Sequence, residues 1–136
     1  MEKCNKNRGF TLAELLIVVA IIGVLVAISI PIFTAQLEKA REATDLSNIR
    51  SAYTAAVADA ITTKKPTVDV KTGNAMKSQG AIEKISSEKC GPWNTDDIVI
   101  NNTGQVVTVH GELNSDGKWA FSLSDGATAP AVVLGS

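Results

Sequence analysis

Few residues of this chain could do chemistry, and one of them stands in an unusual place. Glu14 is a carboxylate just inside an apolar run, and from Leu15 to Phe33 no residue carries a charge. A carboxylate within a membrane segment costs about 2.5 to 3.5 kcal/mol when central, and the positive end of a helix dipole offsets only about 0.3 to 1 kcal/mol. Glu14 therefore needs a partner or a function, unless it lies at the membrane interface and is solvated by lipid head groups.

The residue types that enzymes use do not gather into a set elsewhere in the sequence. His110 is the single histidine, Cys4 and Cys90 are the only cysteines, and no CxxC pair, nucleophile triad or phosphate-binding loop occurs. We therefore expect no enzymatic activity, no cofactor and no metal. His110 is expected to be an ordinary surface histidine on a strand.

Oxygen-bearing side chains near the C-terminus leave one metal hypothesis open. Asn114, Asp116 and Asp125 are of the types that bind calcium in exported loops. An Asn-Ser-Asp-Gly hairpin explains Asn114 and Asp116 without a metal, and we favour that interpretation. Trp93, which follows Gly91-Pro92, is expected to be a core or loop anchor.

The apolar run has the length of a membrane span. A helix over about 19 residues rises about 28 Å, close to the thickness of the hydrocarbon layer. A helix that is apolar all round could instead be buried in a soluble core, but a chain of 136 residues is too small to surround one of this length.

Charge sets the expected orientation of this span. Lys3, Lys6 and Arg8 outweigh Glu2 before the apolar run, so the head is expected to stay in the cytoplasm and the rest to be exported. The exported part is net acidic, which gives no argument for direct nucleic-acid binding. In this orientation Cys4 and Cys90 cannot pair within one chain. Cys90 is then either a small buried hydrophobe, which we favour, or a thiol for an intermolecular bond or a reactive site.

The sequence predicts one long helix followed by a small sheet. No proline or glycine occurs between Pro31 and Pro66, so a single helix from about Thr11 to Thr63 is expected, about 80 Å long. Gly23 and Pro31 interrupt it from within, and a bend is expected around Ala27 to Pro31. The second half is one-sided, with the apolar positions Leu37, Ala40, Leu46, Ile49, Tyr53, Ala56, Val57, Ala60 and Ile61 facing inward and the charged positions Glu38, Lys39, Arg41, Glu42, Asp45 and Arg50 facing outward.

Lysines and a proline end the helix at Lys64-Lys65-Pro66. Periodicity is weak over 67–95, although residues 81–89 could form a short helix. Three strands then follow as an antiparallel meander against the helix: 98–100, 106–109 and 119–123. Residues 131–134 could add an edge strand or form a loose tail.

The segment Gly9-Phe10-Thr11-Leu12-Ala13-Glu14-Leu15-Leu16 resembles the processing motif of type IV prepilins and pseudopilins, and the match extends to Ser29-Ile30-Pro31. It covers about the first third of the chain. The resemblance implies an α+β fold, a long N-terminal helix packed on a small antiparallel sheet. It also implies cleavage between Gly9 and Phe10 by the prepilin peptidase, a membrane aspartic peptidase, and N-methylation of Phe10. Glu14 would then meet the methylated amine of a neighbouring subunit during assembly.

These inferences divide the chain into a leader at 1–9, a membrane and assembly half-helix at 10–33, an amphipathic half-helix at 34–65 and a globular head at 66–136. The expected partners are the peptidase, copies of the chain and other pilins, the inner-membrane assembly platform, and the membrane before assembly. The chain would begin as a single-pass membrane protein with a cytoplasmic leader and an exported C-terminal part. It would end in an extracellular pilus or a periplasmic or wall-spanning pseudopilus.

Three functions are compatible with the sequence. The leading one is the structural subunit of a type IV pilus. A second is a pseudopilin of a type II secretion or competence DNA-uptake system. The third is a membrane-anchored binding module that never polymerises and has no need of Glu14. A second exported cysteine is absent, so the C-terminal disulfide loop familiar from Gram-negative pilins is not expected.

Overall fold

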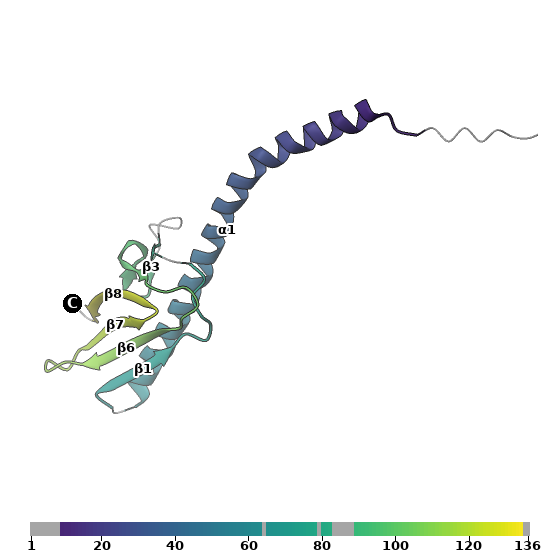
Figure 1. Ribbon diagram of the computed structural model, residues 1–136. Helices are drawn as coiled ribbons and strands as arrows, with labels where there is room; N and C mark the ends of the chain where they lie inside the picture. The colour runs from purple at the N-terminus through teal and green to yellow at the C-terminus, as the bar shows by residue number, and fades with distance from the viewer. Residues whose placement is uncertain (1–8, 64, 79, 83–88, 135–136) are drawn as a thin grey trace, which may run out of the picture. The chain divides into compact units, whose positions relative to one another are not determined.

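A computed structural model describes residues 9–63, 65–78, 80–82 and 89–134 (Figure 1). The helix α1 runs from Leu12 to Thr62, close to the predicted bounds. The chain divides into two compact units, residues 1–36 and 37–136. Each unit is described by itself, and the helix contributes to both. The predicted leader, Cys4 and most of the expected 81–89 helix lie outside the described residues.

In the first unit, helical backbone continues through both predicted interruptions, Gly23 and Pro31. Pro31 has no N–H to donate to Ala27, so one helical hydrogen bond is missing there. Ser29 Oγ donates to the Leu25 carbonyl at 2.7 Å, and Thr34 Oγ1 donates to the Pro31 carbonyl at 3.0 Å. The hydroxyl groups thus bind backbone carbonyls on both sides of the proline. The bend itself stays a prediction.

In the second unit, α1 buries a stripe of small and aliphatic side chains. The buried apolar positions recur at three- and four-residue steps: Leu46, Ile49, Ala52, Ala56 and Ala60. Three alanines among them let the sheet approach the helix closely. Ile61, which the sequence placed inward, is 78% exposed, and Leu37 is also exposed.

Two acidic residues of the helix are buried against expectation. Glu42 is 4% exposed and Asp45 is 0% exposed, although the sequence pattern placed both on the solvent face. Asp45 is buried because a loop from the sheet side covers it and donates hydrogen bonds to its carboxylate, as described below. The solvent-exposed face of this part of the helix is therefore narrower than the positions of its charged residues predict.

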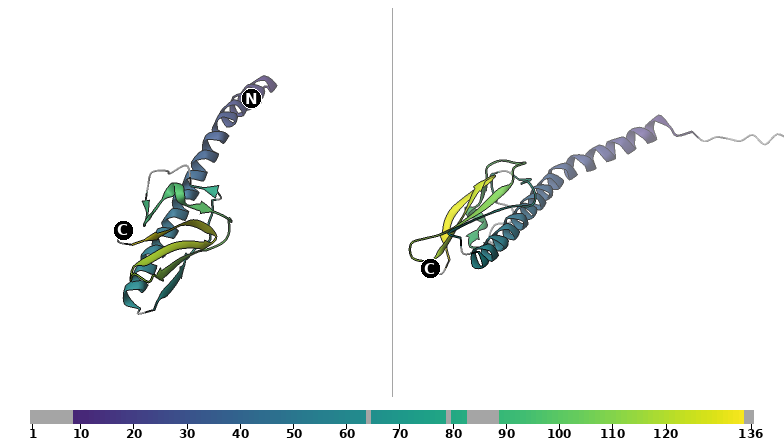
Figure 2. Two further views of the ribbon diagram at one scale, coloured as in Figure 1. Left: turned by 90° about the vertical axis from the view of Figure 1, so that its left-hand side faces the viewer. Right: turned by 90° about the horizontal axis from the view of Figure 1, so that it is seen from below.

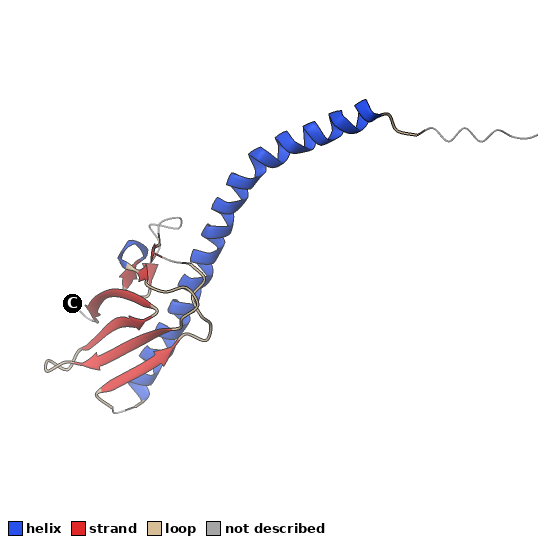
Figure 3. Ribbon diagram, viewed as in Figure 1, coloured by secondary structure: helices blue, strands red, loops and turns tan. Residues whose placement is uncertain are grey.

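A six-stranded sheet packs on this part of the helix (Figures 1 and 3). Its strands lie in the order β1-β6-β7-β8-β5-β2, and all pairs are antiparallel. Their bounds are β1 Thr67–Lys71, β2 Gly80–Ala81, β5 Val99–Ile100, β6 Val107–Leu113, β7 Trp119–Asp125 and β8 Ala127–Val133. A two-stranded hairpin, β3 Lys89–Cys90 and β4 Trp93–Asn94, and the short 3-10 helix Thr95–Asp97 lie between β2 and β5.

The α+β class and the antiparallel meander are confirmed, with three corrections to detail. β6, β7 and β8 form the meander, but the preceding strand β5 pairs with β8 and not with β6. The segment 67–95, whose weak periodicity predicted no strand, supplies β1, β2, β3 and β4. The described ends of the expected 81–89 helix, Ala81 and Lys89, lie in strands.

The core lies between the helix and the inner face of the sheet (Figure 2). Its largest side chains are aromatic. The Tyr53 ring meets Trp93 and Phe121 edge-on, at centroid distances of 5.5 and 5.3 Å. Such T-shaped pairs add about 0.5 to 1.5 kcal/mol each beyond the area they bury. The helix is therefore joined to the hairpin and to the sheet through Tyr53.

Candidate functional site

The candidate site is the first turn of α1, where Thr11 and Glu14 bind one another. The Glu14 carboxylate oxygen Oε2 accepts hydrogen bonds from the Thr11 backbone N–H at 2.8 Å and from the Thr11 hydroxyl at 2.9 Å. In return, the Glu14 backbone N–H donates to Thr11 Oγ1 at 3.3 Å. This reciprocal pattern is a capping box, with Thr11 as the N-cap and Glu14 three residues into the helix.

The capping box gives Glu14 a local role that the sequence analysis did not assign. The T-x-x-E spacing directly before an apolar run is the signal that could have revealed it. The bonds occupy one carboxylate oxygen, and Glu14 remains exposed in the single chain. Its negative charge therefore has hydrogen-bond donors but no cation among the described residues.

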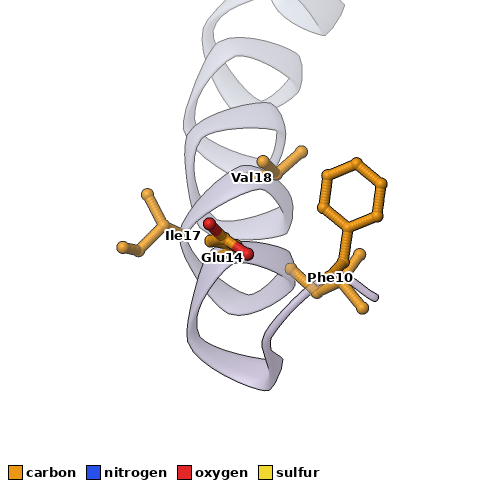
Figure 4. A pocket seen from close by; sticks show the side chains of 5 residues that line it. Phe10, Glu14, Ile17 and Val18 are labelled. Atoms are coloured by element: carbon orange, nitrogen blue, oxygen red, sulfur yellow. The ribbon is translucent and has the colours of Figure 1, made fainter. Parts of the chain in front are cut away.

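A shallow apolar hollow of about 550 Å³ lies beside this carboxylate, lined by Phe10, Glu14, Leu15, Ile17 and Val18. Figure 4 shows Glu14 between Ile17 and Phe10. The residue predicted to become the new N-terminus and the predicted assembly carboxylate thus line the same hollow. The structure brings them together at one end of the helix.

The remainder of this unit is a helix with exposed apolar side chains on all sides. The large apolar residues from Phe10 to Phe33 are 48% to 86% exposed. This is the single helix of the described chain that is long and apolar enough to cross a membrane, and its apolar window is not buried inside the protein. A buried core helix, the alternative raised by the sequence, is therefore excluded. These side chains require another apolar environment, a membrane or other protein chains.

Comparison with protein families identifies the same N-terminal segment. Residues 4–30 match the family model described as the prokaryotic N-terminal methylation motif. The chain is 50% identical to the type IV major pilin PilA of Myxococcus xanthus over 50 residues, which is 37% of this chain and 23% of that protein.

The chain carries the N-terminal methylation motif, and the relatives that it matches are type IV pilins.

Two further relatives extend the similarity beyond the motif. The type IV major alpha-pilin of Moraxella bovis is 31% identical over 85 residues, covering 62% of this chain and 54% of the relative. The narrow pilus major component PilA5 of Thermus thermophilus is 45% identical over 58 residues, covering 40% and 50%. The chain thus spans about half, or less, of the length of these relatives. No solved structure matches it at a significant level.

The curated relatives are named as pilins and fimbrial proteins. The other residues singled out in the sequence take structural positions. Cys90 is fully buried, and its thiol contacts the Leu46 carbonyl at 3.5 Å, which confirms the buried interpretation. Burial raises the pKa of the Cys90 thiol from 9.0 to about 11, and the nearby Arg50 opposes part of that rise.

Trp93 is 1% exposed, and its indole N–H donates to the Pro130 carbonyl at 2.8 Å, so it is a core anchor as predicted. His110 lies on β6, partly exposed, with Nδ1 2.5 Å from the Asp69 carboxylate.

The side-chain oxygens of Asn114 and Asp125, two of the possible calcium ligands, accept hydrogen bonds from within the protein. The side-chain oxygen of Asn114 accepts from the backbone N–H groups of Asp116 and Lys118, at 3.1 and 2.9 Å, which closes the β6-β7 hairpin. The Asp125 carboxylate accepts a hydrogen bond from the Thr108 hydroxyl. Asn114 thus closes the turn that the hairpin alternative predicted, with Asp116 among its donors, whereas Asp125 bonds to the neighbouring strand β6.

Proposed function

We propose that this chain is a structural subunit of a type IV pilus, cut after Gly9, N-methylated at Phe10 and polymerised through the first half of α1. The observation that carries the proposal is the long, exposed apolar surface that begins at Phe10 and holds a single carboxylate, Glu14. Neither a soluble monomer nor a plain membrane anchor requires both features.

The capping box supports cleavage at this position. The N–H and hydroxyl that Glu14 accepts belong to Thr11, one residue beyond the proposed new terminus. Removing residues 1–9 therefore leaves the cap intact and places the new amine one residue before it. Gly9 has no Cβ, so the backbone at this position can lie close against the catalytic centre of a peptidase.

Glu14 supplies the electrostatic part of assembly. In a membrane or a filament core, a carboxylate with hydrogen-bond donors but no cation is stabilised further by a positive charge. The methylated amine of a neighbouring copy is such a charge. Binding it would fix the axial position of one helix against the next, because both groups lie at the same end of α1.

Before assembly, the apolar half of this helix would lie in the membrane. We propose a single-pass precursor with its leader in the cytoplasm, recognised by the prepilin peptidase and delivered to an inner-membrane assembly platform. The second unit, residues 37–136, would be exported and form the outer surface of the filament, together with copies of the chain and other pilins. A pseudopilus would use the same steps and would be distinguished by where the filament is found.

The test compares Glu14→Ala with Glu38→Ala in the native host. Glu38 is a partly exposed glutamate on the same helix whose partner is Arg41, at 3.3 Å, so it controls for loss of a charge as such. We expect Glu14→Ala to be processed and retained in the membrane but depleted from sheared surface filaments, whereas Glu38→Ala assembles normally. Equal incorporation of both variants would contradict the assembly role and favour a non-polymerising membrane-anchored module.

A further inference from the structure

The outer strand of the sheet, β1, presents an open edge. β1 pairs with β6 on one side, in the register Val68 to Gly111 and Val70 to Val109, and it is the first strand in the sheet order (Figure 1). A hollow of about 340 Å³, lined in part by Asp59, Thr67 and Asp69, lies along the start of this edge. No described segment of the chain covers it.

Backbone hydrogen bonds at both ends of β1 show which residues face the open edge. The Leu113 N–H donates to the Pro66 carbonyl, and the Thr72 N–H donates to the Val107 carbonyl, each at 2.8 Å. In an antiparallel pair such bonds alternate, so the even-numbered residues Val68 and Val70 bond to β6. The N–H and C=O groups of Thr67, Asp69 and Lys71 therefore point outward.

The side chains on this edge are self-complementary in charge. Asp69 and Lys71 alternate with Val68 and Val70, so both charged groups stand on the exposed face of the sheet. The Asp69 carboxylate is oriented by His110, and no carboxylate forms an ion pair with Lys71 within the described part of the chain. Two copies of the sequence Asp-Val-Lys, laid antiparallel, bring each aspartate opposite the other copy's lysine.

Charge also selects one register among the neighbouring ones. Shifting the two strands one way places Asp69 opposite Asp69, and the other way places Lys71 opposite Lys71, and like charges directly opposite destabilise a sheet. The intermediate register has Val70 opposite Val70. Val70 is partly buried at the rim of the core, and the second copy would cover its exposed side.

We propose that β1 pairs with β1 of a second copy of this chain, antiparallel and two-fold symmetric about Val70, which joins the two sheets into one. Each copy contributes the Asp69 and Lys71 backbone groups to the hydrogen bonds and one Asp69-Lys71 ion pair on the exposed face. The proposal concerns the second unit alone and does not depend on how the N-terminal helix assembles. The contact is small, so it is weak between single molecules and strengthened where many copies are arrayed.

Cysteine capture tests the register in the full chain purified in detergent, with Cys4→Ser as the background. Val70 is a non-hydrogen-bonded position on the open edge, where directly opposed Cα atoms lie about 4.5 Å apart, a spacing that suits a disulfide. The matched control is Thr67→Cys on the same edge. In the proposed register the two copies of residue 67 are six positions apart, about 20 Å.

We expect Val70→Cys to form disulfide-linked dimers several-fold faster than Thr67→Cys, although Thr67 is the more exposed residue and random collision would favour it. Equal rates, or a faster Thr67→Cys, would overturn the proposal. Charge reversal adds a second criterion: in the Val70→Cys chain, Asp69→Lys and Lys71→Asp should each slow the dimer, and the two together should restore it. A double reversal as slow as the single ones would also overturn it.

One measurement needs no substitution near the edge. Isotopically heavy and light copies are mixed and treated with a carbodiimide, which joins a carboxylate to an amine as an amide and is itself converted to a urea. A mixed-isotope peptide joining Asp69 to Lys71 is expected. Its absence, with other intermolecular cross-links present, would contradict the pairing even if a cysteine variant failed to fold.

Discussion

The buried carboxylate of Asp45 ties the segment after β1 to the helix. It accepts hydrogen bonds from the backbone N–H of Lys77, at 2.9 and 2.8 Å, and from the backbone N–H and hydroxyl of Ser78, both at 2.6 Å. The same segment bonds to the β5-β6 connection, because the Gly104 N–H donates to the Met76 carbonyl. The Asp45 side chain thus holds residues 77 and 78, which lie outside regular secondary structure, against the helix.

Asp45→Asn is expected to lower the free energy of unfolding by about 2 kcal/mol, because charge-assisted bonds become neutral ones and the amide group faces backbone donors. The measurement is urea unfolding of the full chain in detergent. The control is Asp59→Asn, an exposed position on the same helix, expected to change stability by no more than about 0.5 kcal/mol. Equal effects of the two substitutions would show that the Asp45 bonds do not stabilise the fold.

Burial of the Cys90 thiol makes stability depend on pH at the alkaline end. The folded pKa is raised from 9.0 to about 11, so above pH 9 the unfolded chain loses this proton while the folded chain retains it. The contribution is fully present below pH 9 and is lost as the pH rises toward 11. Burial also raises the pKa of Tyr53, which acts in the same direction.

Comparing the parent chain with Cys90→Ala separates the two groups. The fall in unfolding free energy between pH 9 and 11 should be shallower in Cys90→Ala, and the remaining slope belongs to other groups such as Tyr53. Native Cys90 should also resist alkylation at neutral pH and react once the chain is unfolded. Rapid alkylation of the folded chain would contradict the buried position.

For single residues, the sequence predicted a special role where the residue type is unusual for its surroundings. Glu14 stands out because a charge is costly in an apolar run, and Trp93 because a large aromatic after Gly-Pro needs a place to pack. Asp45 was not predictable. Its burial depends on donors 32 and 33 residues away in the chain, and helical periodicity carries no information about them.

At the scale of elements, the hairpin of β3 and β4 depends on one glycine. Gly91 has φ of 63°, and a Cβ built on it would lie 2.6 Å from the Tyr53 ring. Gly117, in the β6-β7 turn, has a similar φ of 75° but open space around it. Gly91 and Gly117 thus have nearly the same backbone conformation, but only Gly91 is packed against another side chain.

Gly91→Ala is therefore expected to destabilise the fold more than Gly117→Ala. The left-handed conformation alone costs about 1 to 2 kcal/mol in either variant. The displaced Tyr53 ring adds to that cost at Gly91 and disturbs its contacts with Trp93 and Phe121. Thermal unfolding of the two variants gives the comparison, and equal losses would show that the hairpin does not pack on Tyr53 as described.

The elements differ in how far the sequence predicted them. Both ends of α1 and the positions of β6 and β7 follow from local patterns: continuous helical periodicity, a proline after lysines, and β-branched runs bounded by turn residues. β1 has the alternation Val68, Asp69, Val70, Lys71, but it is short and lies among polar residues, so only its pairing with β6 reveals it as a strand. The pairing of β5 with β8 is a long-range choice of partner that no local pattern encodes.

At the scale of the whole molecule, two units with different requirements share one helix. The second unit buries its own core and needs no partner to do so, whereas the first unit buries almost nothing of its apolar surface. The N-terminal motif was recognisable from the sequence because it is long and specific, and the family model matches the same segment. The head carries no such motif, so its strand order became known only from the structure.

The first unit therefore holds the central claim, that its apolar helix is released from a leader and buried among copies of itself. The most direct measurement is mass spectrometry of the N-terminal peptide of filaments sheared from cells. The account predicts a chain that begins at N-methylated Phe10, with residues 1–9 absent, and a Gly9→Val chain that keeps its leader and is missing from the filaments. Filaments built from chains that still carry residues 1–9, or begin elsewhere, would contradict it.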